Sequence, residues 1–170
     1  MEESNSKHIL SIMVDNEPGV LARVVGLFSG RGYNIESLSV SEVDSDKFLS
    51  RVTVVTSGTK IIIDQIKAQL KKLIPVHNLI DVSELKTFIG KELILIKLNL
   101  KKGEVSNIYK LIERNGAQIL LDNREEIIIQ YCGSPSEISA MIKKLRPYNI
   151  IELTRSGLVS MALGTEYIKK

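Results

Sequence analysis

The residues best suited to chemistry lie in one stretch of this 170-residue chain, DNEPGVLARVVGLFSGRGYNIESLSV, residues 15–40. The stretch has no cysteine, no histidine and no cluster of metal ligands, so it is suited to binding rather than to catalysis. Pro18 favours the first turn of a helix, and Gly19 allows another molecule to approach the backbone closely. The free N–H groups of that helix start, together with the helix dipole, form a site for a carboxylate.

Asn16 lies just before this helix start, and its amide can both donate and accept hydrogen bonds. The amide oxygen would receive an ammonium group while the helix N–H groups receive a carboxylate, and a free amino acid carries both groups. From these residues alone, a simpler interpretation is favoured. Asn16 would then only order the turn, as asparagine commonly does, and Gly19 would serve helix packing alone.

The composition is that of an ordinary globular protein. The net charge of +3 is too small to indicate a nucleic-acid or membrane partner by itself. The single cysteine, Cys132, makes no intrachain disulfide or cysteine-based zinc site, and we expect it to be a small apolar core residue. The polar N-terminus lacks the apolar segment of a signal peptide, and no apolar run has the roughly 18 residues of a membrane span. We therefore expect a cytoplasmic protein.

The first half of the chain predicts a βαββαβ unit, which we assign to residues 1–84. Its first helix, after Pro18, carries apolar residues at the spacing that lines one helical face, namely Leu21, Val24, Val25 and Phe28. The other expected elements are strands at residues 8–14, 33–40, 48–56 and 76–85, and a helix at residues 59–73.

The pattern restarts near residue 91, and we assign residues 91–170 to a second βαββαβ unit. One helix of this half has strong local signals, because Ser134 and Glu137 form a capping box around Pro135 at the first helical position. The other expected elements are strands at residues 91–100, 117–122, 126–132 and 149–155, and a helix at residues 104–116.

Two such units predict an α+β protein with two tandem ferredoxin-like layers, each with helices on one face of an antiparallel sheet. Each half is small for a self-sufficient core, and each sheet leaves one face uncovered and its edge strands unpaired. We therefore expect association, with residues 33–40 as a natural edge for it. The first turn lacks the Cys-x-x-Cys of a metal chaperone, and the central strands lack the stacking aromatics of an RNA-binding layer.

The opening stretch resembles the regulatory small subunit of acetolactate synthase, also called acetohydroxyacid synthase. Its Asn-x-x-Gly-x-Leu turn, residues 16–21, is similar to turns found across amino-acid-sensing ACT domains, and GLFSGRGYNIESL is closer to this subfamily. The similarity continues through LSRVTVVT, QLKKLIPV, KELILIKL and LRPYNIIELTRSG, so it covers nearly the whole chain. Lys91 and Thr154 stand where arginine and alanine are expected in many relatives, and neither lies in the turn.

The resemblance implies an N-terminal ACT domain, a C-terminal ACT-like domain, and a homodimer whose N-terminal domains pair edge to edge. A branched-chain amino acid, typically valine, would bind at that interface, between the turn of one chain and the start of the second strand of the other. The expected contacts are Asn16, Gly19, Val20, Leu21, Asn34 and Ile35. Another interpretation of Asn34 is that asparagine tolerates a left-handed backbone there. The C-terminal half lacks an Asn-x-x-Gly turn, so we expect no second amino-acid site in it, and contact with the large subunit is one possible role.

The resemblance also implies a non-catalytic subunit that activates the catalytic large subunit and confers feedback inhibition in branched-chain amino acid biosynthesis. Acetolactate formation requires thiamine diphosphate and Mg²⁺, which we expect, with FAD, on the large subunit. This chain has no diphosphate-and-metal motif, and its two histidines, His8 and His77, lie far apart in sequence. Two alternatives remain: a stand-alone tandem ACT sensor that acts on a different enzyme or regulator, and a small enzyme.

Overall fold

The computed structural model describes residues 5–99, 101, 103–123, 126–164 and 167–168, and the chain divides into two compact units. The first contains the chain up to Ile89 together with the segment from Leu158 onward, and the second contains residues 90–157. The assignment of residues 91–170 to one C-terminal domain stays a prediction, and in the structure the segment from Leu158 onward groups with the first unit. In the described part of the chain, no helix is long and apolar enough to cross a membrane.

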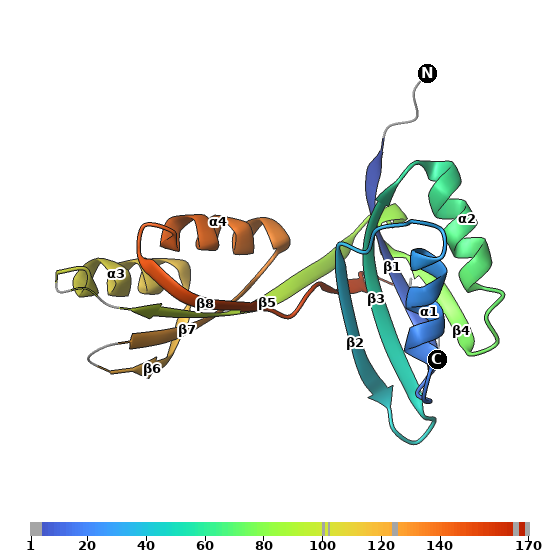
Figure 1. Ribbon diagram of the computed structural model, residues 1–170, viewed down its shortest axis with the longest axis horizontal. Coiled ribbons are helices and arrows are strands. Elements are labelled where there is room, and N and C mark those ends of the chain that lie inside the picture. The colour runs from blue at the N-terminus through green and yellow to red at the C-terminus, as the bar shows by residue number, and fades with distance from the viewer. Residues whose placement is uncertain (1–4, 100, 102, 124–125, 165–166, 169–170) are drawn as a thin grey trace. The chain divides into compact units, whose positions relative to one another are not determined.

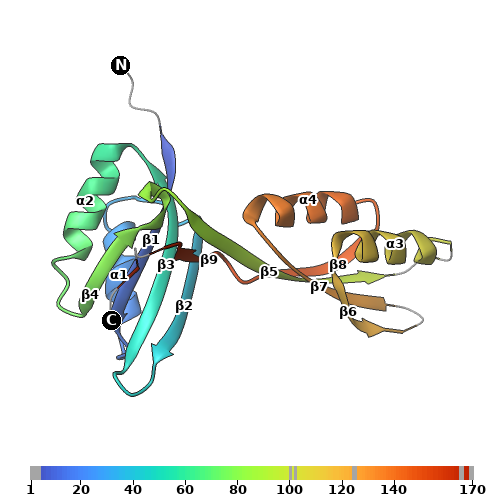
Figure 2. The same ribbon diagram turned by 180° about the vertical axis from the view of Figure 1, so that it is seen from behind.

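The first unit has the predicted element order βαββαβ (Figure 1). Its sheet is antiparallel with strand order β2-β3-β1-β4, so that β2 forms one edge and β4 the other. Both helices lie on one face of this sheet (Figures 1 and 2). The elements are β1 (Ser6–Asp15), α1 (Val20–Ser29), β2 (Ser37–Asp44), β3 (Leu49–Gly58), α2 (Lys60–Leu70), β4 (Val76–Asp81) and the 3₁₀-helix η1 (Val82–Glu84).

The core of the first unit lies between the sheet and these helices. Alternate residues of β1 point toward the helices, and Phe28 of α1 is fully buried against them. The predicted inward face of α1 was partly wrong, since Leu21 is 40% exposed and Val25 is only half-buried. Val20 and Leu27 are buried in place of Leu21 and Val25. The buried face of α1 therefore consists of Val20, Val24, Leu27 and Phe28.

The opposite face of the first sheet is covered by the end of the chain. Leu158 packs with Ile9 and Val55, and Ile168 packs with Met13 and Leu49. The backbone N–H of Leu158 also donates to the Ser37 hydroxyl, at 3.1 Å. The expectation of an uncovered sheet face was therefore wrong for the first unit, because a segment distant in sequence returns to bury it.

The second unit repeats the layer with strand order β6-β7-β5-β8. The predicted capping box is confirmed at the start of α4, where the Ser134 hydroxyl accepts from the Glu137 N–H and the Glu137 carboxylate accepts from the Ser134 N–H. A short final strand, β9 (Val159–Ala162), pairs with β5 and belongs to the first unit. The other elements are β5 (Phe88–Asn99), α3 (Val105–Asn115), β6 (Gln118–Asp122), β7 (Glu126–Gly133), α4 (Pro135–Leu145) and β8 (Asn149–Arg155). The predicted fold class, two tandem βαββαβ layers, is confirmed.

The core of the second unit faces α3 and α4, and its other sheet face is more open. Ile94 and Ile96 of β5 are fully buried, whereas the alternate residues Leu93 and Leu95 are each 37% exposed. Cys132 was predicted to be a core residue and is exposed instead. Its partner across the sheet is Leu93, so it lies on the open face, and the prediction failed because an apolar run does not reveal which residues point inward.

Candidate functional site

The turn between β1 and α1 is held by backbone hydrogen bonds to two neighbouring loops. The Asn16 N–H donates to the Phe48 carbonyl at 2.6 Å, and the Asp15 N–H donates to the Pro75 carbonyl at 3.0 Å. Asn16 itself is exposed, and its side-chain amide has no hydrogen-bond partner within the described residues. The turn is therefore fixed through its backbone, which leaves the Asn16 amide available to a ligand.

Gly19 is the N-cap of α1 and has a left-handed backbone, with φ of 84°. Pro18 was expected in the first helical turn, but the helix begins at Val20, so Pro18 precedes the cap. No side chain caps α1 and its first turn contains no acidic residue. The N–H groups of Leu21 and Ala22 thus lack intrahelical partners at the positive end of the helix dipole.

Asn34 and Ile35 lie just before β2 and are held against β3. The Thr56 hydroxyl, fully buried, donates to the Asn34 carbonyl at 2.7 Å. The nearby Glu36 carboxylate forms an ion pair with Lys7 at 2.7 Å, and this hydrogen bond holds the Glu36 pKa below its ordinary value. Asn34 does not have the left-handed backbone that asparagine tolerates, because Phe48 is the one non-glycine residue with positive φ in the described part of the chain.

The structure brings the predicted site residues together in two groups rather than one. Asn16, Gly19, Val20 and Leu21 follow the end of β1, where Asp15 pairs with Leu49. Asn34 and Ile35 lie at the other end, because their neighbour Thr56 pairs with His8 near the start of β1. His8 and Asp15 are seven residues apart, which is about 23 Å along a strand. One small ligand cannot contact both groups within a single chain.

Sequence reasoning missed the two residues that fix these groups, Phe48 and Thr56. Phe48 supplies the carbonyl that holds Asn16, and Thr56 supplies the hydroxyl that holds the Asn34 carbonyl. Neither carries a signal in the sequence: a threonine is ordinary in a strand, and phenylalanine is among the less expected residues at a positive φ.

The two histidines bond to different carboxylates: His77 to Asp15, and His8 to Asp81. His8 Nδ1 lies 2.7 Å from Asp81 Oδ2, and His8 Nε2 lies 2.8 Å from the Ser6 hydroxyl. Candidate metal-ligand atoms of His8, Asp81 and Glu84 lie within 4.8 Å of one another, but the Glu84 carboxylate is bonded to the Lys67 ammonium at 2.9 Å. Both imidazole nitrogens and both carboxylates already have partners, so this group is a satisfied polar network at the sheet edge.

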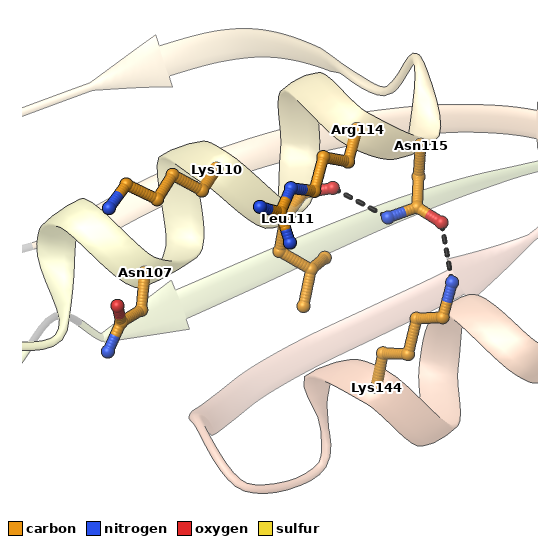
Figure 3. Close-up of a pocket in the computed structure, with 6 residues that line it drawn as sticks. All are labelled: Asn107, Lys110, Leu111, Arg114, Asn115 and Lys144. Carbon is orange, nitrogen blue, oxygen red and sulfur yellow. Dashed lines mark hydrogen bonds between the residues drawn. The ribbon is translucent and has the colours of Figure 1, made fainter.

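The second unit contains a cationic pocket of about 480 Å³ between α3 and α4 (Figure 3). The Asn115 amide donates to the Leu111 carbonyl of the same helix at 2.7 Å. Its oxygen accepts from the Lys144 ammonium of α4 at 2.6 Å, and this second bond links the two helices. The full lining is Asn107, Lys110, Leu111, Arg114, Asn115 and Lys144. It contains no carboxylate and three cationic side chains, Lys110, Arg114 and Lys144, so it would favour an anion.

The helix start of the second unit differs from that of the first. The N-cap of α3 is Glu104, whose carboxylate therefore lies at the positive end of the helix. One oxygen of this carboxylate is buried and has no hydrogen-bond partner among the described residues. An incoming carboxylate would meet a like charge at this helix start, which it would not meet at α1.

Comparisons with known proteins match both units. Residues 10–78 match the model of the AHAS small subunit-like ACT domain, and residues 91–164 match the model described as the small subunit of acetolactate synthase. The chain is 38% identical to a probable acetolactate synthase small subunit of Archaeoglobus fulgidus over 163 residues, 94% of this chain and 99% of that protein. It is 36% identical to the acetolactate synthase small subunit of Mycobacterium leprae, over 92% of each chain.

The structural comparison agrees over nearly the full length. The crystal structure of the acetolactate synthase small subunit from Thermotoga maritima superposes with a TM-score of 0.87 at 31% sequence identity, covering 95% of this chain and 99% of that chain. The matches span both units and include the β1–α1 turn. This chain belongs to the acetolactate synthase small-subunit family.

Proposed function

We propose that this chain is the regulatory subunit that activates the catalytic large subunit of acetolactate synthase and confers feedback inhibition by valine or a related branched-chain amino acid. The effector binds between the N-terminal domains of two copies, at Asn16, Gly19, Val20 and Leu21 of one copy and Asn34 and Ile35 of the other. The observation that carries this proposal is the separation of these two groups to opposite ends of the first sheet.

Pairing of two β2 edges unites the two groups. Within one chain, Ser37 pairs with Val55 and Asp44 pairs with Leu49, so β2 runs from the Asn34 end of the sheet to the Asn16 end. A two-fold axis between two β2 strands makes them antiparallel and brings each Ser37 close to the partner's Asp44. The start of one β2 then approaches the β1–α1 turn of the other copy, and two equivalent sites form.

The edge strand is suited to such pairing. β2 contributes Val40 and Val43, which are 42% and 41% exposed. In the described residues its hydrogen-bonded neighbour is β3, which leaves the other edge of β2 for a second chain. Pairing would bury this apolar surface and extend the first sheet across the dimer.

The site matches the charges of a free amino acid. The open N–H groups at the start of α1 receive the carboxylate, and the positive end of the helix dipole favours it. The Asn16 amide oxygen accepts from the ammonium group. Leu21 is 40% exposed beside this turn, so it offers an apolar contact to a branched side chain, which Ile35 of the partner copy completes.

Regulation follows from linkage between two binding equilibria. Valine lowers activity if it binds a less active state of the complex more tightly than the active state, and the difference between these two affinities limits the effect. The coupling free energy between an effector site and a second site is typically about 1–3 kcal/mol. The chain itself contributes no catalytic residue. Thiamine diphosphate, Mg²⁺ and FAD are assigned to the large subunit, as the chemistry of acetolactate formation requires a cofactor of that kind there.

Reconstitution with the cognate large subunit tests this function. We expect the small subunit to raise acetolactate formation from pyruvate, valine to reverse that gain, and the small subunit alone to form none. Sedimentation should show a dimer at micromolar concentration. A stable monomer in the presence of valine, or turnover by the pure chain, would refute the proposal.

A further inference from the structure

Three loops lie side by side at one end of the first sheet, with the β1–α1 turn between the other two (Figures 1 and 2). The β2–β3 hairpin bonds to the turn through the Phe48 carbonyl, which accepts from Asn16. The loop between α2 and β4 bonds to it through the Pro75 carbonyl, which accepts from Asp15. The β1–α1 turn, where we expect the effector to bind and which we call the effector turn, is thus hydrogen-bonded to both flanking loops.

Each flanking loop presents a large apolar side chain to solvent. Phe48 is 67% exposed and Ile74 is 95% exposed, although both are residue types that folding normally buries. Polar groups occur on the same loops and strand ends, including the His77–Asp15 side-chain hydrogen bond at 2.5 Å and the Asp44 carboxylate that accepts from the Lys47 N–H at 3.2 Å. Apolar anchors within a polar rim are the usual anatomy of a protein interface.

The backbone of Phe48 supports the same interpretation. Its φ of 49° lies in the left-handed region, where glycine or asparagine would be unstrained and an aromatic residue is an outlier. Because the ring is largely exposed, its packing within the first unit offsets little of the backbone strain. Its gain would come from burial in a partner, which is where an exposed aromatic anchor contributes most to binding.

A second copy of the chain does not account for the exposure of Ile74. Proposed dimerisation uses β2, at one edge of the sheet, whereas Ile74 precedes β4, at the opposite edge. The Ile74 side chain therefore stays exposed in a β2-paired dimer and is available to a different protein. A small subunit has one partner implied by its family, the catalytic large subunit.

We propose that Phe48 and Ile74 are the apolar anchors with which the first unit docks onto the catalytic large subunit of acetolactate synthase. This inference rests on the proposed function and assigns the docking surface. It also gives the route of regulation. Because the effector turn is bonded to both anchor-bearing loops, an effector that shifts Asn16 changes how the anchors fit the large subunit.

The test is titration of the purified large subunit with small-subunit variants, with acetolactate formation as the readout. Ile74→Ser removes one anchor from a fully exposed position, and Phe48→Asn removes the other while keeping the backbone carbonyl and tolerating positive φ. Each should raise the concentration for half-maximal activation at least tenfold, and the double variant at least a hundredfold. Valine binding and dimerisation of the Ile74→Ser variant, measured on the small subunit alone, should stay within threefold of wild type.

The matched control is Ile61→Ser, which changes another exposed isoleucine, 59% exposed, near the start of α2 at the far end of the unit. It should leave the activation midpoint within twofold of wild type. If Ile74→Ser and Phe48→Asn also stay within twofold while wild type activates, the docking proposal is wrong and the proposed function stands. If wild-type small subunit neither binds nor activates the large subunit, the proposed function itself fails. Since Ile74 is almost wholly exposed, its variant is expected to fold, and it tests the docking proposal even if the Phe48 variant does not fold.

Discussion

The two units share one topology and differ at the turn that follows their first strand. In the first unit, α1 begins after Gly19, with no capping side chain and no acidic residue in its first turn. In the second unit, α3 begins after Gly103, also at positive φ, but its N-cap is Glu104. The start of α1 has no acidic side chain in its first turn, whereas the start of α3 carries the Glu104 carboxylate. We therefore expect only the start of α1 to receive an anionic ligand.

The units also differ at the sheet face turned away from the helices. Leu158 and Ile168 cover this face in the first unit and are only 3% and 7% exposed. In the second unit the equivalent face exposes Leu93 and Leu95. The central strands of the first sheet, β1 and β3, therefore have buried residues on both faces.

The largest expected effect comes from placing an acidic side chain at the open turn. Gly19→Asp should raise the dissociation constant for valine at least a thousandfold, about 4 kcal/mol, because its carboxylate repels that of the ligand. Titration calorimetry with valine measures this loss. Activation of the large subunit should persist, since the backbone bonds of Asn16 and Asp15 are unchanged.

Gly103→Asp is the matched control in the second unit. Both glycines have positive φ, 84° and 96°, and a Cβ added at either meets no atom within 4 Å. The backbone strain of the two substitutions is therefore alike, about 1 kcal/mol, while only the first adds charge at the ligand turn. Equal valine affinity in the two folded variants would mean that Gly19 is not part of the site.

A second contrast concerns the covered and open sheet faces. Leu158→Ala should destabilise the chain by about 2–3 kcal/mol, because it removes a buried side chain and leaves a cavity. Leu95→Ala, at a residue that is 37% exposed, should cost less than about 1 kcal/mol. Urea unfolding followed by circular dichroism measures both. Similar losses would show that the terminal segment does not stabilise the first sheet.

Most of the fold could be predicted from local patterns. Strand alternation, helical periodicity and the capping box at Ser134 each depend on neighbours in sequence, and they located both βαββαβ layers. The covering of the first sheet by Leu158 and Ile168 could not be predicted, because that contact joins the chain's end to its beginning. The burial of Cys132 was mispredicted for a related reason, since an apolar strand does not reveal which face is covered.

The candidate site was predictable only in its residue types. The turn and the strand start were proposed from resemblance, and their positions at opposite ends of one sheet required the strand register. The positive φ of Phe48 and its bond to Asn16 had no sequence signal, because the preferred residues at such positions are glycine and asparagine. Whether these residues bind valine stays a prediction.

A smaller effect distinguishes the capped helix α4 from the uncapped helix α1. Ser134→Ala removes the hydroxyl that accepts from the Glu137 N–H and should cost about 1 kcal/mol of unfolding free energy. Ser139→Ala is the control, because that hydroxyl bonds back to the Pro135 carbonyl within the same helix. Alanine is favoured inside a helix, so the control should be neutral or slightly stabilising. A loss in both variants would mean that the capping box adds nothing specific.

The smallest expected effect is the pH dependence of that capping box. The backbone N–H of Ser134 bonds to the Glu137 carboxylate and, with Lys91 nearby, lowers the Glu137 pKa from its ordinary value of 4.5. A lowered folded-state pKa means that ionised Glu137 stabilises the fold above pH 4.5 and that this contribution is lost as pH falls through the folded pKa. Glu137→Gln keeps a hydrogen-bond acceptor but cannot titrate. The stability difference between wild type and this variant should therefore be greatest near neutral pH and shrink below pH 4.5, measured by urea unfolding at each pH. A difference that is constant from about pH 7 to about pH 3 would show that the charge of Glu137 does not stabilise the start of α4.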